Sequence, residues 1–349
     1  MIKIAFVKSS IYQDLWVCDK TNDFIEIFRT SLMRCPAIGL AEHFNTDFII
    51  IKDNDEYPCN LNKGWTRRSH YDNIKYSKKN KYPDLPFLDE TYHEHISIDS
   101  VAYNEDDIDW NKYNIVITIN NCISNKIINK YNKILWCYYN GENDETTINK
   151  LIENYDISLN QDVNKQGLPN HSIGFPYTFV GPDTIEKLNM KLYPDMICKK
   201  EGIYMEINNT TDRPVKNIPF EFLEISKNCN IPIILHDQNI IENSKKLYNS
   251  KYFVKLLGRQ LRGNSILEAA SAGVLILANK NLVTFNDLIF DNCQISNHED
   301  VIEKIKYYDN NKDEYDKVIK FQRKILFEKY FLNPINNLYK KYYEKIQII

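Results

Sequence analysis

The sequence predicts an α/β protein of two domains, each built on a mostly parallel sheet. The chain has 349 residues, which is enough for two domains that each bury their own core. Short runs of β-branched and aromatic residues alternate along it with segments of helical spacing. The runs are almost continuously apolar, as strands covered on both faces require. This alternation predicts parallel sheets between layers of helices.

Eight such runs are the predicted strands, and they form two groups of four. The first group is 2–7 (IKIAFV), 47–52 (DFIIIK), 113–119 (YNIVITI) and 133–139 (KILWCYY), and the second is 203–207 (IYMEI), 231–236 (IPIILH), 252–257 (YFVKLL) and 274–278 (VLILA). Helical spacing lies between the runs and continues to the end of the chain, where Pro334 is well placed to begin the last helix.

A turn-rich and charged segment, 193–202, separates the two groups and predicts the domain boundary. We expect a first domain over 1–198 and a second over 199–330. The terminal helix, within 331–349, is expected to pack back on the first domain.

The first domain carries a predicted insertion at about 53–110. Its basic part, 63–81, has seven Lys or Arg against one acid, and its acidic part, 84–109, has nine acids and no Lys or Arg. Opposed blocks without an apolar period are typical of a solvated surface region. The alternative is an arm that contacts an acceptor through Trp65 and its basic neighbours.

Bulk properties exclude several classes of protein. The net charge is −3, so no global field gathers nucleic acid. No apolar run reaches the roughly 18 residues of a membrane span. The eight cysteines are scattered, which indicates reduced thiols and a cytoplasmic protein. His93 and His95 could bind a metal, but they lie in an acidic segment that is typical of a protein surface. We therefore expect no metal site, and we expect no cofactor.

The segment Gly258 to Gly273 contains three of the ten glycines in the chain and leads into a short helix with small residues on one face. Ser265 and Glu268 have the spacing of a capping box, which needs no ligand. The same helix N-terminus would also attract a diphosphate, with Arg259 and Arg262 nearby to neutralise it. Glu268 could then accept hydrogen bonds from a ribose diol.

The run GNSILEAASAGVLILANKN, 263–281, resembles the donor site of GT-B fold glycosyltransferases, where a glycine-bearing loop leads into a helix reading Glu-Ala-x-x-x-Gly. The resemblance implies two Rossmann-like domains that face each other across a cleft, with C-terminal helices. It assigns the ribose of a nucleotide sugar to Glu268, and the diphosphate to Gly263, Asn264 and Ser265. Basic residues upstream usually meet the phosphates in this family, which implies Arg259 and, after it, Arg262 or Lys255.

One position departs from the family pattern. Members with the Glu-x7-Glu motif have a glutamate where this chain has Gln260. An amide still hydrogen-bonds a sugar hydroxyl, but it supplies no negative charge beside an oxocarbenium-like transition state. Retention of anomeric configuration therefore does not carry over.

An inverting transferase needs a base in the first domain. Loops at the carboxyl ends of parallel strands face the cleft. Glu142, directly after the strand 133–139, is the first candidate for the catalytic base, and Asp14, after the strand 2–7, is the second. A solvated carboxylate in a loop is the structural alternative for both.

Together these observations predict a glycosyltransferase that moves a sugar from a nucleotide-sugar donor to a hydroxyl of a glycan or other acceptor. Neither nucleic acid nor a membrane span is expected to take part. The alternatives are a noncatalytic module that binds a nucleotide or glycan, favoured by Gln260, and a sugar-nucleotide epimerase of the same fold.

Overall fold

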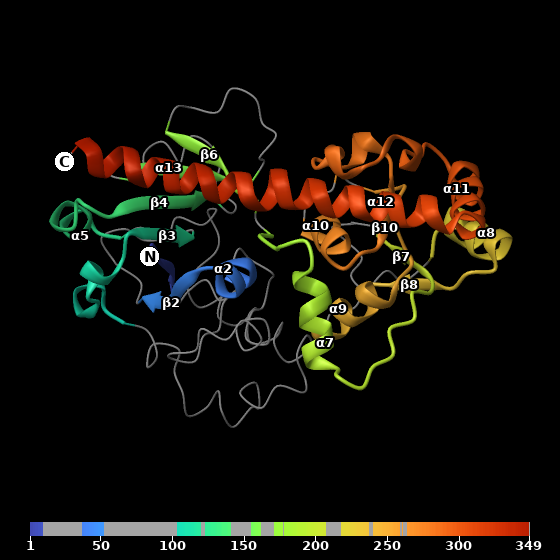
Figure 1. Cartoon of the computed structure of the whole chain (residues 1–349), viewed down its shortest axis with the longest axis horizontal. Coiled ribbons are helices and arrows are strands. Elements are labelled where there is room, and N and C mark those ends of the chain that lie inside the picture. The colour runs from blue at the N-terminus through green and yellow to red at the C-terminus, as the bar shows by residue number, and fades with distance from the viewer. Residues whose placement is uncertain are drawn as a thin grey trace. The chain divides into compact units, whose positions relative to one another are not determined.

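The computed structural model describes residues 1–9, 37–51, 103–119, 123–140, 155–161, 171–176, 178–206, 218–236, 240–258, 260 and 264–348. By its internal contacts the chain divides into unit 1, Met1–Phe179 with Asn333–Ile349, and unit 2, Val180–Leu332 (Figure 1). Each unit contains a parallel sheet, and all eight predicted strands are confirmed. The predicted α/β fold class is therefore correct.

The sheet of unit 1 has six parallel strands. Their order is β2 (Asn45–Ile51), β1 (Lys3–Ser9), β3 (Ile115–Ile119), β4 (Leu135–Asn140), β5 (Ile157–Asn160) and β6 (Ser172–Gly174). The sequence did not predict β5 and β6. Both are short and carry serine and asparagine or glycine, so neither shows the apolar run on which the other predictions depended.

In the described part of unit 1 the helices are α2 (Ala37–His43), the single turns η3 (Glu105–Asp107) and η4 (Trp110–Lys112), α5 (Asn125–Lys130) and α13 (Asn333–Ile348). The turns η3 and η4 lie at the end of the predicted insertion. Most of the described residues there are exposed, as the prediction of a solvated surface requires: Tyr103, Asn104, Asp106, Asp107 and Asp109. Trp110 is the exception. Trp110 is fully buried and its ring lies 5.4 Å from that of Trp136. Glu105 also accepts a hydrogen bond from the Ser124 amide at 3.0 Å, which ties η3 to the start of α5.

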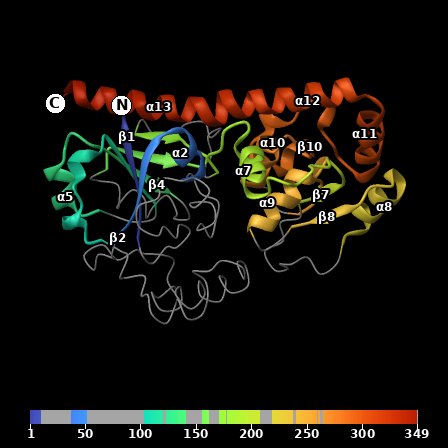
Figure 2. The ribbon, with the colours of Figure 1, turned by 60° about the horizontal axis from the view of Figure 1, so that its bottom comes forward.

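The terminal helix α13 packs beside β4 and β6 (Figures 1 and 2). Tyr342 accepts a hydrogen bond from the side chain of Asn114 at 2.7 Å. Lys345 donates to the carboxylate of Asp156 at 2.6 Å and to the carbonyl of Ile134 at 2.7 Å. These contacts attach α13 to the sheet of unit 1.

The sheet of unit 2 has four parallel strands in the order β10 (Leu275–Ala278), β9 (Tyr252–Lys255), β7 (Ile203–Met205) and β8 (Ile233–Leu235). Its helices are α7 (Thr184–Leu192), α8 (Phe220–Cys229), α9 (Ile240–Asn249), α10 (Asn264–Ser271), α11 (His298–Asn310) and α12 (Lys312–Ile325). Three single turns, η5 (Lys280–Leu282), η6 (Asn286–Leu288) and η7 (Asp291–Cys293), follow β10, and a π-helical segment, η8 (Leu326–Leu332), follows α12.

The two units divide at Phe179 and Val180, earlier in the chain than the predicted boundary at 198 and 199. The reason is that α7 is held by polar contacts within unit 2. The hydroxyl of Ser271 in α10 accepts from the Ile185 amide at 3.0 Å and donates to the Gly181 carbonyl at 2.7 Å. Asn189 donates to the hydroxyl of Ser244 in α9 at 3.0 Å. The turn-rich segment 193–202 is therefore a connection inside unit 2.

Lys200 joins the C-terminal ends of α9 and α10. Its ammonium donates to the carbonyls of Tyr248 and Ala272, the latter at 2.7 Å. Burial, the largest cause, lowers the pKa of Lys200 from 10.5 to about 8. Between these values the unfolded chain binds more protons at this site than the folded chain does. The free energy of unfolding contributed by Lys200 therefore rises with pH through that window.

We expect this rise to disappear in Lys200→Met, while Lys191→Met, a change at an exposed lysine of α7, keeps it. Urea unfolding followed by circular dichroism from pH 7.5 to 9.5 measures it as the difference between wild type and each variant. A wild-type minus Lys200→Met difference that stays flat or falls with pH would contradict the assignment.

Candidate functional site

Both sheets reverse their winding direction once. In unit 1 the reversal lies between β1 and β3, because β1 has β2 on one side and β3 on the other. In unit 2 it lies between β7 and β9, because β7 has β8 on one side and β9 on the other. In open parallel sheets, ligands bind outside the carboxyl ends of the strands at this switch point. The candidate site therefore lies at the carboxyl edge of unit 2, near the switch point between β7 and β9.

Three ionisable residues stand side by side at that edge. Met205 is in register with Val254 of β9 and with Leu235 of β8. The Glu206 amide donates to the Val254 carbonyl at 3.1 Å, so the ladder continues one residue further. His236, Glu206 and Lys255 are thus neighbours across three strand ends, and we call them the edge row.

The edge row lies on the face of the sheet that α9 covers. Side chains alternate between faces along a strand, so Glu206 shares a face with Tyr204. Tyr204 donates to the side chain of Asn243 in α9 at 2.8 Å. In contrast, Tyr252 donates to Asp309 of α11 on the other face, at 2.7 Å. Since α7 bonds to both α9 and α10, these three helices form one layer, and α10 lies on the same side as the edge row.

Buried charge gathers here. Among the described residues, the buried charged side chains are Glu206 (8% exposed), Lys255 (0%) and Glu268 (3%), and all three belong to this part of unit 2. Removing an ion from water costs several kcal/mol. Charged side chains are therefore rarely buried unless an ion partner or a function offsets this cost. Their concentration near a switch point indicates a functional site.

Helix α10 begins at Asn264, so Ser265 is its second residue and does not hold the N-cap position. The capping box that we considered for Ser265 and Glu268 therefore does not have the expected geometry. Side chains on a helix lean toward its N-terminus, which brings the Glu268 carboxylate toward the carboxyl edge. Gly273, with φ of +64°, ends the helix and turns the chain into β10.

The sequence-predicted site residues fall into two groups. Glu268 is buried, Ser265 is partly exposed, Gln260 is exposed, and Asn264 starts α10. The others lie outside the described residues: Asp14, Glu142, Arg259, Arg262, Gly263, and also Trp65, His93 and His95. Of the bases, Asp14 follows β1, which ends at Ser9, and Glu142 follows β4, which ends at Asn140.

Sequence reasoning missed Glu206. The signal was present, because Glu206 is an acid inside the apolar run IYMEI. An acid inside a strand that is buried on both faces is unusual, and this is the signal that could have identified it. Lys255 was a candidate from the sequence for binding the phosphates. The structure shows that it is the last residue of β9 and that it is fully buried.

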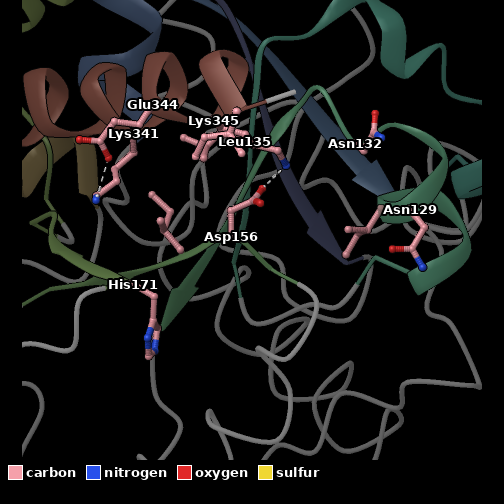
Figure 3. Close-up of a pocket in the computed structure, with 11 residues that line it drawn as sticks. Asn129, Asn132, Leu135, Asp156, His171, Lys341, Glu344 and Lys345 are labelled. Atoms are coloured by element: carbon pink, nitrogen blue, oxygen red, sulfur yellow. Dashed lines mark hydrogen bonds and ion pairs between the residues drawn. The ribbon is translucent and has the colours of Figure 1, made fainter.

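An open groove of about 680 Å³ lies in unit 1, at the amino ends of β4 and β5 (Figure 3). Its charged side chains pair with one another. Figure 3 shows Asp156 and Lys345 pointing toward each other, and Lys341 lies 3.0 Å from Glu344. Because it is at the amino edge and its charges are satisfied internally, we do not assign it to the candidate site.

In the described part of the chain, no group of three or more His, Cys, Asp or Glu side chains could hold a metal ion. The helices found there include none that is long and apolar enough to cross a membrane.

No protein-family model matches the chain, and no curated protein matches its sequence. Solved structures do resemble it. An α-glucosyltransferase in complex with UDP and a 13-mer DNA containing a central A:G mismatch has a TM-score of 0.50 and 12% identity, over 98% of this chain and 100% of that one. This likeness shows the fold and confirms the predicted GT-B class.

Two further structures match at lower TM-scores. A UDP-GlcNAc 2-epimerase from Neisseria meningitidis has a TM-score of 0.44 and 11% identity, over 99% of this chain and 100% of that one. Sucrose-phosphate synthase from Thermosynechococcus elongatus has a TM-score of 0.44 and 10% identity, over all of both chains.

Proposed function

We propose that this protein is a glycosyltransferase that moves a sugar from a nucleotide-sugar donor to a hydroxyl of a glycan or other acceptor. The observation that carries the proposal is the buried charge of unit 2, which Glu206 and Lys255 provide at the carboxyl edge of the sheet and Glu268 provides one turn inside α10. Charge at this place, in this fold, is suited to a ligand that combines phosphates with hydroxyls.

Each part of a nucleotide sugar has a matching group. The free amides and dipole at the N-terminus of α10 suit a diphosphate. Lys255 adds positive charge at the same edge, and Arg259 and Arg262 precede the helix in the chain. The Glu268 carboxylate suits a pair of ribose hydroxyls, which are donors. Amides and cations neutralise the phosphates in this arrangement, so we propose that no metal ion is required.

The acceptor hydroxyl must lose its proton during transfer. We propose Glu142 as the base and Asp14 as the second choice, since each follows a strand of unit 1 at the carboxyl edge of its sheet. Direct in-line transfer with such a base inverts the anomeric configuration.

A noncatalytic nucleotide-binding or glycan-binding module is the second candidate. The observation that favours it is Gln260. It occupies the position at which retaining members of the resembled family have a glutamate, and its side chain is exposed. A binding module needs the donor pocket but not the base.

The test is release of nucleoside diphosphate from nucleotide sugars, with and without glycan acceptors and in the presence of EDTA. UDP-sugars come first, because the α-glucosyltransferase of the same fold was solved with UDP. We expect acceptor-dependent release that EDTA leaves unchanged, that Glu268→Gln reduces, and that Glu303→Gln, at an exposed position of α11, does not reduce. Binding without turnover would support the module, and conversion of the donor sugar without an acceptor would indicate an epimerase.

A further inference from the structure

A chain of three hydrogen-bonded side chains in unit 2 ends at the imidazole of His236. The Tyr204 hydroxyl donates to the Oδ1 of Asn243 at 2.8 Å and lies 2.8 Å from the Nδ1 of His236. Tyr204 is fully buried and Asn243 is 5% exposed, whereas His236 is exposed. A buried polar pair thus holds a ring at the surface.

The positions of the protons follow from counting donors. A phenol has one proton, and an amide oxygen only accepts. Tyr204 gives its proton to Asn243, so it must accept from His236, and the Nδ1 of His236 carries the hydrogen. In a neutral imidazole the other nitrogen, Nε2, is then the acceptor. The Tyr204–Asn243 pair selects this one tautomer.

The imidazole ring of His236 lies at the carboxyl edge of the sheet, where a ligand could contact it. His236 follows β8 at the carboxyl edge and belongs to the edge row with Glu206 and Lys255. Tyr204 stacks on Phe253, with ring centroids 5.8 Å apart and planes 9° apart, so the core keeps its hydroxyl in place. Because the tautomer is fixed, the Nε2 of His236 is an acceptor for a hydrogen-bond donor of a bound ligand.

We propose that His236 is a ligand-binding residue of unit 2, whose Nε2 accepts a hydrogen bond from a hydroxyl of the bound nucleotide sugar. Tyr204 and Asn243 are its positioning residues. The inference rests on the proposed function. The hydroxyl belongs either to the ribose or to the transferred sugar, which offer the same chemistry.

The experiment is calorimetric titration of a nucleotide sugar and of its nucleoside diphosphate into the full chain. We expect His236→Ala to weaken nucleotide-sugar binding about 10-fold, because one hydrogen bond is lost. His236→Gln restores an acceptor oxygen and should recover most of the affinity. Tyr204→Phe keeps the stacked ring but releases the tautomer, with a loss of about 3-fold. His171→Ala, at an exposed histidine of unit 1, is the matched control and should bind as wild type does.

The two ligands identify the hydroxyl. A loss confined to the nucleotide sugar places it on the transferred sugar, and an equal loss for both ligands places it on the ribose. Wild-type affinity for both ligands in His236→Ala would overturn the inference, as would a glutamine variant no better than the alanine one. If the wild type itself binds neither ligand, the proposed function fails, and this outcome is separate from a failure of His236 alone.

Discussion

Glu268→Ala is expected to weaken nucleoside diphosphate binding about 100-fold. Glu268 is 3% exposed and lies one turn inside α10, with its side chain leaning toward the carboxyl edge. Each hydrogen bond from a ribose hydroxyl to a carboxylate contributes about 1.5 kcal/mol or more, so losing two costs about 3 kcal/mol. That energy corresponds to about two orders of magnitude in affinity.

The controls separate binding from folding. Glu268→Gln keeps the shape and one acceptor oxygen, so we expect a loss of about 10-fold, set by the missing charge. The melting temperature without ligand shows whether each variant folds. A folded alanine variant with wild-type affinity for every nucleoside diphosphate tested would contradict the role of Glu268.

Gly39→Ala is expected to destabilise unit 1 by about 3 kcal/mol. An added Cβ would lie 2.3 Å from the Phe179 carbonyl oxygen and 2.7 Å from the Cδ1 of its ring. The Gly39 amide donates to the same oxygen at 2.9 Å, so relieving the clash would also stretch a hydrogen bond. Alanine favours a helix over glycine by about 1 kcal/mol, which is too little to offset this.

Urea unfolding followed by tryptophan fluorescence measures the effect in unit 1, because all four tryptophans of the chain lie before residue 180. Adding Phe179→Leu to Gly39→Ala removes the ring contact but leaves the backbone oxygen. The double variant should therefore remain unstable. A midpoint at or above that of wild type in Gly39→Ala would show that α2 has room for the methyl group.

The sequence predicted correctly those elements that depend on residues close together in the chain. All eight predicted strands have apolar runs, and all eight are present, while β5 and β6 have no such run and were not predicted. The domain boundary depended on contacts between distant residues. Ser271 is far from α7 in the sequence but binds its start, and no local pattern at 193–202 indicates this contact.

The site was predictable in part, for the same reason. The helix with Glu268 has a motif, whereas the edge row depends on the register of β7, β8 and β9. Lys255 was a candidate from the sequence, whereas Glu206 was not considered. Their adjacency, and the Tyr204–Asn243 pair behind His236, become visible when the strands are aligned.

The most direct measurement of the central claim is calorimetric titration of the wild-type chain with UDP, GDP, CMP, dTDP and ADP, in EDTA. We expect one nucleotide to bind at micromolar concentration without metal, since α10 and Lys255 supply the positive field at the carboxyl edge. If none binds at millimolar concentration, the buried charges of unit 2 do not form a nucleotide site, and the glycosyltransferase assignment falls with them.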